Sequence, residues 1–222
     1  MKASPLALGP GFQLGPIPIS KPVIVTWGLM AALVLVSALL TRRLSLSPHA
    51  GQSALELFIE TLDAQIRDTL RADPAPYRAL IGTIFIFVLL ANWSSLIPGV
   101  EPPTARLETD AALAFIVFFS TIYHGLRTRG VLGYLKTFAE PSVIMVPLNL
   151  VEQLTRSFSL IVRLFGNIMS GVFVVGIILS IAGLLVPIPL MALDLLTGAV
   201  QAYIFATLAT VFIGSAVDGH ES

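Results

Sequence analysis

The stretch SLIVRLFGN, residues 159–167, places one arginine, Arg163, inside a long apolar run. Between residues 160 and 217 the only formal charges are Arg163 and Asp194. A charged side chain at the centre of a bilayer costs from about 2.5 to more than 10 kcal/mol, depending on the method. A guanidinium in such a run therefore needs an opposite charge, and the sequence raises the question of where that charge lies.

The composition is that of a membrane protein. Of the 222 residues, 55% are hydrophobic and 12% are charged, whereas soluble domains carry about 25% charged residues. Cysteine is absent, which excludes disulfides, cysteine metal sites and thiol catalysis. The net charge is zero, which gives no indication of nucleic-acid binding, and no phosphate-binding loop is present. We expect no cofactor, no metal site and no nucleotide hydrolysis by this chain alone.

Five apolar segments are long enough to approach or exceed the roughly 20 residues that cross a bilayer. They cover residues 23–41, 80–98, 111–126, 141–182 and 189–217. Residues 53–70 differ, because their apolar positions recur at helical spacing with acidic and basic residues between them. This pattern predicts an amphipathic helix at the membrane interface, or a helix packed on a partner subunit. The expected fold class is an all-α polytopic membrane protein.

The basic residues predict the orientation of the chain. Eight lie in the loops after the first and third spans, and three lie on the opposite side. The positive-inside rule then puts the N-terminus outside and the C-terminus in the cytoplasm. We expect an irregular N-terminal tail at 1–22, a single integral membrane domain at 23–217 and a cytoplasmic tail at 218–222.

The last two segments are too long to be upright helices. Residues 141–182 would form a helix of roughly 60 Å and residues 189–217 one of about 43 Å, against a hydrocarbon thickness of about 30 Å. Their ends are not polar, so protrusion into water is unfavourable. The sequence favours a steeply tilted helical hairpin with its turn near residues 182–188, and Pro147 is a candidate kink.

Hairpin geometry argues against a direct ion pair between Arg163 and Asp194. With the turn centred near residue 182, Gln201 shares the depth of Arg163, whereas Asp194 lies about 10 Å closer to the outside, near Val172. Glu152 lies eleven residues before Arg163, about 16 Å away along the helix. The missing anion is therefore most economically placed on another subunit.

Small residues recur every four positions on both helices of the hairpin, which lets helices approach closely in lipid. They are Gly198, Ala202, Ala206 and Thr210 on the second helix and Gly166 and Ser170 on the first. Packing between subunits and packing within the hairpin are both consistent with this spacing.

Several stretches resemble those of a known family. SLIVRLFGN, LTGAVQAYIFATLATVFIG, PLNLVEQLTRSFSL, ANWSSLIPG and the final GH occur in the order and spacing of subunit a of the F-type ATP synthases. The resemblance covers about residues 75–221 and is to the bacterial and chloroplast forms.

The resemblance implies a stator subunit with two offset half-channels, facing a rotating ring of c subunits and anchored with peripheral-stalk b subunits. Arg163 would keep each passing ring carboxylate ionised and would block direct leakage. Asn167 and Gln201 match polar positions beside that arginine, and Ser170 lies on the same ion pathway. The resemblance also implies a bacterial inner membrane and coupling of H⁺ or Na⁺ flow to ATP synthesis or ATP-driven pumping.

One departure from the family concerns a carboxylate. Related chains usually carry a glutamate nine residues after the arginine, where this sequence has Val172, preceded by Gly171. Asp194 occupies a position where other members place His or Glu across the hairpin. Asp194 is therefore the candidate relay of the outer half-channel, and a buried polar group with a purely structural role is the alternative.

The outer and inner loops supply further candidate residues. Arg106 stands roughly where the family commonly has an acid, and Glu101, Glu108 and Asp110 lie nearby. These three could line the outer entrance, although solvated loop charges are the favoured interpretation. On the inner side, the candidate exit is formed by Glu152, Asn149 and Arg156.

Two other classes of protein fit the sequence less well. A secondary transporter that binds an anionic substrate at Arg163 would be expected to show internal repeat symmetry, which the chain lacks. An intramembrane hydrolase would need a Ser–His or paired-Asp arrangement within the spans, and none is present. The choice between H⁺ and Na⁺ stays open at the level of this sequence.

Overall fold

The computed structural model describes residues 13–14, 17–18, 21–42, 50–97, 100–139, 146–182 and 186–217. The predicted tail 218–222 and the basic residues Lys2 and Arg43 lie outside these ranges. The long helices are α1 (Lys21–Thr41), α2 (Ala50–Leu70), α3 (Ala75–Trp93), α4 (Leu107–Ala139), α5 (Val146–Ala182) and α6 (Pro187–Val217). Two 3₁₀ turns, η1 (Ser94–Leu96) and η2 (Pro103–Ala105), separate α3 from α4.

The helical fold is confirmed. Five of the described helices are long and apolar enough to cross a membrane, and they are α1, α3, α4, α5 and α6. In the segment expected to be irregular, the short strands β1 (Gln13–Leu14) and β2 (Ile17–Pro18) form an antiparallel pair. The third span is longer than expected and runs from Leu107 to Tyr134, because the charged residues 108 and 110 belong to its first turn.

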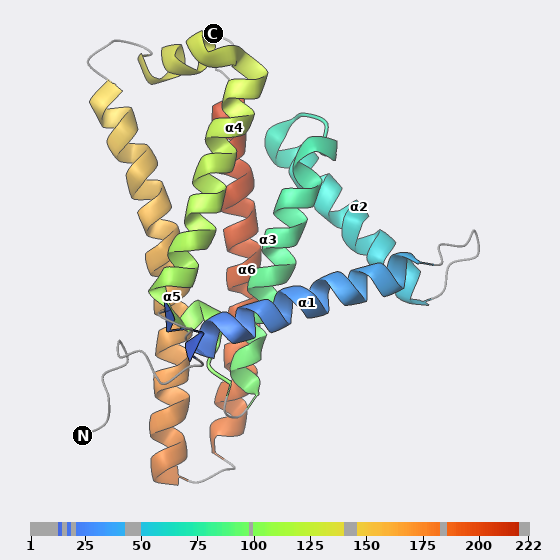
Figure 1. Ribbon diagram of the computed structural model, residues 1–222, viewed down its shortest axis with the longest axis vertical. Helices are drawn as coiled ribbons and strands as arrows, with labels where there is room; N and C mark the ends of the chain where they lie inside the picture. The colour runs from blue at the N-terminus through green and yellow to red at the C-terminus, as the bar shows by residue number, and fades with distance from the viewer. Residues whose placement is uncertain are drawn as a thin grey trace.

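Four antiparallel helices, α3 to α6, form the bundle, and Figure 1 shows α1 lying across them rather than alongside them. α6 contacts α3, α4 and α5, and α4 also contacts α5. The predicted long hairpin is present: α5 and α6 have 37 and 31 residues, with the connection between Ala182 and Pro187, although α5 begins at residue 146 and not at 141. Pro147 does not kink α5, because it is the second residue of that helix, where proline is tolerated.

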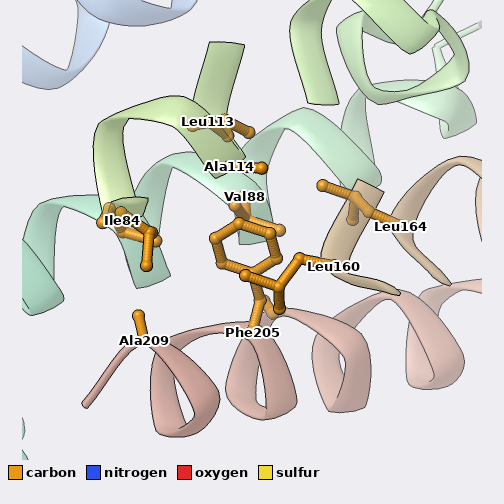
Figure 2. Packing of buried hydrophobic residues seen from close by; sticks show 10 residues of the cluster. Ile84, Val88, Leu113, Ala114, Leu160, Leu164, Phe205 and Ala209 are labelled. Carbon is orange, nitrogen blue, oxygen red and sulfur yellow. The ribbon is translucent and has the colours of Figure 1, made fainter. Parts of the chain in front are cut away.

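The core of the bundle is a layer of apolar side chains from all four helices (Figure 2). Phe205 of α6 is fully buried at its centre, and Leu160 and Leu164 of α5 pack around it. The remaining buried members of this apolar layer are Ile84, Val88, Leu113, Ala114, Val117, Ala202 and Ala209.

The amphipathic helix is confirmed as α2, and much of its apolar face is covered by the chain itself. Leu62, Ile66 and Leu70 pack with residues of α3 and α6 in a second buried cluster. Gln65 Nε2 also donates to Thr207 Oγ1 of α6 at 2.6 Å. The other members of this cluster are Tyr77, Ile81, Ala206 and Ile213.

The small residues of α6 are buried inside the chain. A Cβ added at Gly198 would lie 3.1 Å from the Cβ of Asn92 on α3, and Ala206 belongs to the α2–α3 cluster. The α6 stripe therefore packs against neighbours of its own chain. On α5, by contrast, Gly166 and Ser170 are exposed, so that face of the hairpin has no partner among the described residues.

Candidate functional site

Arg163 lies on the exposed face of α5 and makes no ion pair or hydrogen bond within the described part of the chain. Leu160 and Leu164, on the adjoining side of the helix, are buried in the apolar layer. Arg163 therefore lies at the edge of the buried stripe of α5, where its own side chain faces outward. The guanidinium is thus held on a rigid helix and presented outward.

A cavity of about 600 Å³ reaches Arg163 from the end of the bundle where α5 begins. Glu152, Arg156, Ser159 and Arg163 all line it, at spacings of four, three and four residues that place them on one face of α5. Leu208 and Phe212 of α6 form part of the opposite wall. The predicted inner residue Glu152 is thereby connected to Arg163 through one continuous hollow, and Asn149 lies one turn before Glu152, half-buried.

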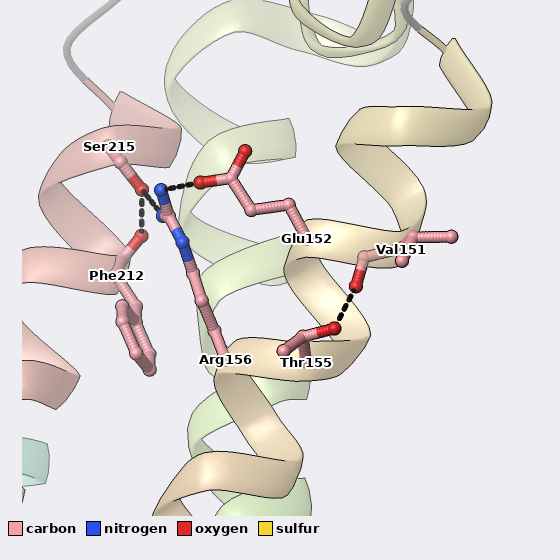
Figure 3. Close-up of polar contacts among 6 residues, drawn as sticks. All are labelled: Val151, Glu152, Thr155, Arg156, Phe212 and Ser215. Carbon is pink, nitrogen blue, oxygen red and sulfur yellow. Dashed lines mark hydrogen bonds and ion pairs between the residues drawn. The ribbon is translucent and has the colours of Figure 1, made fainter.

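Arg156 joins α5 to α6 at the mouth of this cavity (Figure 3). Its guanidinium forms an ion pair with Glu152 and donates a long hydrogen bond of 3.5 Å to Ser215 Oγ. The same group lies 5.6 Å from the ring centroid of Phe212. Nearby, Arg129 Nε donates to the carbonyl of Val217 at 3.0 Å, where a cation favours the C-terminus of a helix.

A second, smaller hollow of about 200 Å³ lies farther along the hairpin, toward the turn. Asn167, Ser170 and Gly171 of α5 and Asp194 and Thr197 of α6 line it. The carboxylate of Asp194 accepts a hydrogen bond of 3.2 Å from Ser95 Oγ of η1. Arg163 lines the first cavity and Asp194 the second, and the predicted absence of a direct pair between them holds in the structure.

Gly171 leaves the room that the Asp194 carboxylate occupies. A Cβ built on Gly171 would collide with Asp194 Oδ1 and would lie 2.9 Å from its Cγ. The expected depth of Asp194, opposite Val172, is therefore correct to within one residue. A side chain at position 171 and a carboxylate reaching over from position 194 exclude each other.

The outer acidic residues do not behave as a group of solvated charges. Glu101 pairs with Arg106, with 2.7 Å between the carboxylate and the guanidinium, and Glu108 is exposed. Asp110, in contrast, is 0% exposed, and neither of its carboxylate oxygens has a hydrogen-bond partner among the described residues. The favoured interpretation of Asp110 as a solvated loop charge is wrong, because this residue lies on the inner face of the first turn of α4.

Gln201 is also buried, at 6% exposure, and its Nε2 has no partner. Three residues that composition and spacing did not single out donate hydrogen bonds from α3 and η1 to the part of α6 that precedes Gln201. Asn92 Nδ2 donates to the carbonyl of Gly198 at 2.9 Å, Trp93 Nε1 donates to Leu195 at 3.1 Å, and Ser95 reaches Asp194. The sequence feature that could have identified these three residues is the polar run NWSS, residues 92–95, at the end of an apolar span.

Within the described ranges, no three Asp, Glu, His or Cys side chains gather into a group that could hold a metal ion. The arrangement offers an exposed guanidinium, Arg163, at the inner end of one hollow and close to a second, with a carboxylate in the lining of each, Glu152 and Asp194. A guanidinium presented in this way is suited to bind an anion such as a carboxylate.

Known proteins with similar sequences share one family. The family model described as ATP synthase A chain matches residues 23–214. The chain is 55% identical over 217 residues to ATP synthase subunit a 2 of a Bradyrhizobium species, covering 98% of this chain and 97% of that protein. It is 44% identical to ATP synthase subunit a of Albidiferax ferrireducens, over 95% and 92% of the two chains. For ATP synthase subunit a 2 of Acaryochloris marina the identity is 45%, over 94% and 91%.

Proposed function

Since the chain belongs to the family of ATP synthase A chains, we propose that it is the ion-translocating stator subunit of an F-type ATP synthase. In this role the chain is an integral membrane subunit that faces a ring of c subunits and provides two half-channels. Flow of H⁺ or Na⁺ through them is coupled to ATP synthesis, and the reverse reaction drives pumping. In this proposal the chain itself does not hydrolyse nucleotide.

One observation carries the proposal: Arg163 is exposed between two separate hollows and has no ion pair or hydrogen bond with any described residue. A guanidinium left on a lipid-facing surface would be costly, so its position is explained by an anion that another subunit brings to it. A ring carboxylate about 4 Å away would gain about 4 kcal/mol at an effective dielectric constant of 20. That attraction favours the ionised form of the carboxylate as it passes.

The two hollows supply the half-channels. Glu152 and Asn149 lie on the inner route, which reaches Arg163 through the larger cavity. Asp194, with Ser170 and Asn167, lies on the outer route. The positive charge of Arg163 separates the two, because a cation that leaves one hollow is repelled before it reaches the other. Each charge driven across gains about 2.3 kcal/mol per 100 mV.

Gln201 adds a buried amide at about the depth of Arg163, and Glu101 and Glu108 lie on the outer surface that an entering ion would meet first. In our proposal the chain lies in a bacterial inner membrane with its N-terminus outside. The basic end of the bundle, which carries Arg129 and Arg156, then faces the cytoplasm. The long hairpin is steeply tilted along the ring, and b subunits of the peripheral stalk hold the other side of the chain.

The test is ATP-driven ion uptake by the complete complex in liposomes. We expect Arg163→Ala to abolish uptake while the complex still assembles, and Arg127→Ala, an exposed arginine on α4, to keep it. Undiminished uptake with Arg163→Ala would overturn the proposal.

The same preparation identifies the coupling ion. Uptake that requires sodium and survives an uncoupler indicates Na⁺, whereas uptake that an uncoupler collapses indicates H⁺. Asp194→Asn then separates a relay from a structural group, because only the loss of a relay slows transport in a correctly assembled complex.

A further inference from the structure

Directly below the apolar layer of the bundle, the side chains become polar. Moving one helical turn toward the α5–α6 connection leads from Val88 to Asn92 on α3 and from Ala114 to Asp110 on α4. On α6 the same step leads from Phe205 to Gln201. Because α3 runs antiparallel to α4 and α6, these opposite steps in sequence go the same way in space, by about 6 Å.

Asn92, Asp110, Gln201 and Thr104 of η2 form what we call the polar layer. Their exposed fractions are 2%, 0%, 6% and 0%. η2 brings Thr104 to the layer, since this turn packs against α3, α4 and α5. The hydrogen bond from Asn92 to the carbonyl of Gly198 ties α3 to α6 at this depth. On α5 the corresponding residue is the apolar Ile168.

Five buried polar atoms of this layer have no hydrogen-bond partner in the part of the chain that the structure describes. They are Asn92 Oδ1, Thr104 Oγ1, both carboxylate oxygens of Asp110 and Gln201 Nε2. Buried polar groups are almost always satisfied, and leaving one unpaired costs about 1–3 kcal/mol. An ionised carboxylate without a partner costs more still. Five such atoms in one layer indicate a site that something fills.

The chemistry of these atoms specifies the occupant. Three are oxygen acceptors, one is a hydroxyl and one is an amide donor, and the only formal charge is that of Asp110. Hard oxygen ligands suit a hard cation, and a single carboxylate balances a single positive charge. We propose that the polar layer binds one monovalent cation, a hydrated proton or Na⁺, with Asp110 as its counter-charge.

This site rests on the proposed function, because it gives the outer half-channel a binding station inside the bundle. Its depth is intermediate: Gly198 lies one turn beyond Asp194 along α6, and Gln201 lies one turn deeper. Ser95, which holds Asp194, follows Asn92 by three residues. A cation can thus be held between the Asp194 hollow and the level of Arg163.

The test uses carbodiimide labelling of the assembled wild-type complex, a reaction that needs a free protonated carboxyl group. Trypsin releases residues 107–127, in which Glu108 and Asp110 are the only carboxylates, and tandem mass spectrometry assigns the adduct. Exposed Glu108 serves as the internal reference. Labelling is compared in sodium chloride and choline chloride, and across a pH series.

For a sodium site, labelling of Asp110 falls about tenfold at a sodium concentration of ten times the dissociation constant. For a site that holds an exchangeable proton, labelling of Asp110 does not depend on sodium and falls by up to about tenfold for each unit of rising pH. Labelling of Asp110 that is independent of both sodium and pH would overturn the proposal.

A transport measurement completes the test. ATP-driven uptake should fall by about an order of magnitude or more with Asp110→Asn, and the exposed control Asp68→Asn on α2 should keep it. Full uptake with Asp110→Asn in an assembled complex would contradict a cation site on the pathway. Retained uptake with Arg163→Ala would instead overturn the proposed stator function. Failure of the cation site and failure of the stator function are therefore distinguishable.

Discussion

At the scale of single residues, Gly171 and Asp194 share one small space from opposite helices of the hairpin. The glycine has no side chain, and the carboxylate of Asp194 fills the position that a Cβ would take. Ser95 then orients the carboxylate from a third element, η1. The position of this carboxylate therefore depends on three residues that are distant in the sequence.

We expect Gly171→Ala to displace the Asp194 carboxylate. Its Cβ would approach Asp194 Cγ to 2.9 Å, and relief of such a contact costs about 1–3 kcal/mol. ATP-driven ion uptake should fall, together with the thermal stability of the complex. The matched control is Gly176→Ala on the same helix, where a new Cβ meets nothing within 4 Å. Equal behaviour of the two variants would show that Asp194 needs no such room.

At the scale of elements, α4 is two helical segments joined at one glycine. Gly130 has φ 70° and ψ 170°, and Figure 1 shows the chain turning sharply near the end of α4. Only glycine readily adopts this backbone conformation. The bend sends residues 131–139 away from the bundle axis while Arg129, just before it, stays bound to the end of α6.

Gly130→Ala should therefore destabilise the chain by about 1–3 kcal/mol, although a Cβ at this position meets no neighbour within 4 Å. The cost comes from the backbone alone. A denaturation series in mixed detergent micelles measures it, with Gly28→Ala in the regular helix α1 as the control. Alanine is the better helix former there, so the control should be neutral or slightly stabilising. An unaffected midpoint for Gly130→Ala would contradict the assigned strain.

At the scale of the whole molecule, α2 is docked against the four-helix bundle and is not only a surface helix. The apolar face of α2 packs on both α3 and α6, so residues near positions 65 and 210, far apart in the sequence, are in contact. The packed helix α2 also covers the small residue Ala206 of α6.

Ile66→Ala should weaken the packing of α2 on the bundle, because Ile66 is 0% exposed and its truncation leaves a cavity. Such a truncation lowers the free energy of unfolding by about 2–5 kcal/mol. Hydrogen exchange across residues 50–70 should accelerate, and the midpoint of detergent denaturation should fall. Leu57→Ala on the same helix is the control, since Leu57 is 65% exposed and should change stability by less than about 0.5 kcal/mol. If both variants behaved alike, α2 would not be docked as described.

The sequence by itself determined the spans, the amphipathic helix and the long hairpin. Lipid offers no hydrogen bonds to the backbone, so a sufficiently apolar run must be helical wherever it packs. Helical rise alone also separated Arg163 from Asp194, because depth along a hairpin follows from counting residues on either side of its turn.

Only the tertiary structure decided which neighbours the polar side chains meet. The burial of Asp110 depends on helices and a turn that come from separate parts of the chain, and local charge density suggested the opposite. The partner of the small stripe on α6 is α3, which no spacing rule identifies. The physical reason is that period and length are local properties, whereas burial and hydrogen bonding are set by whichever elements pack together.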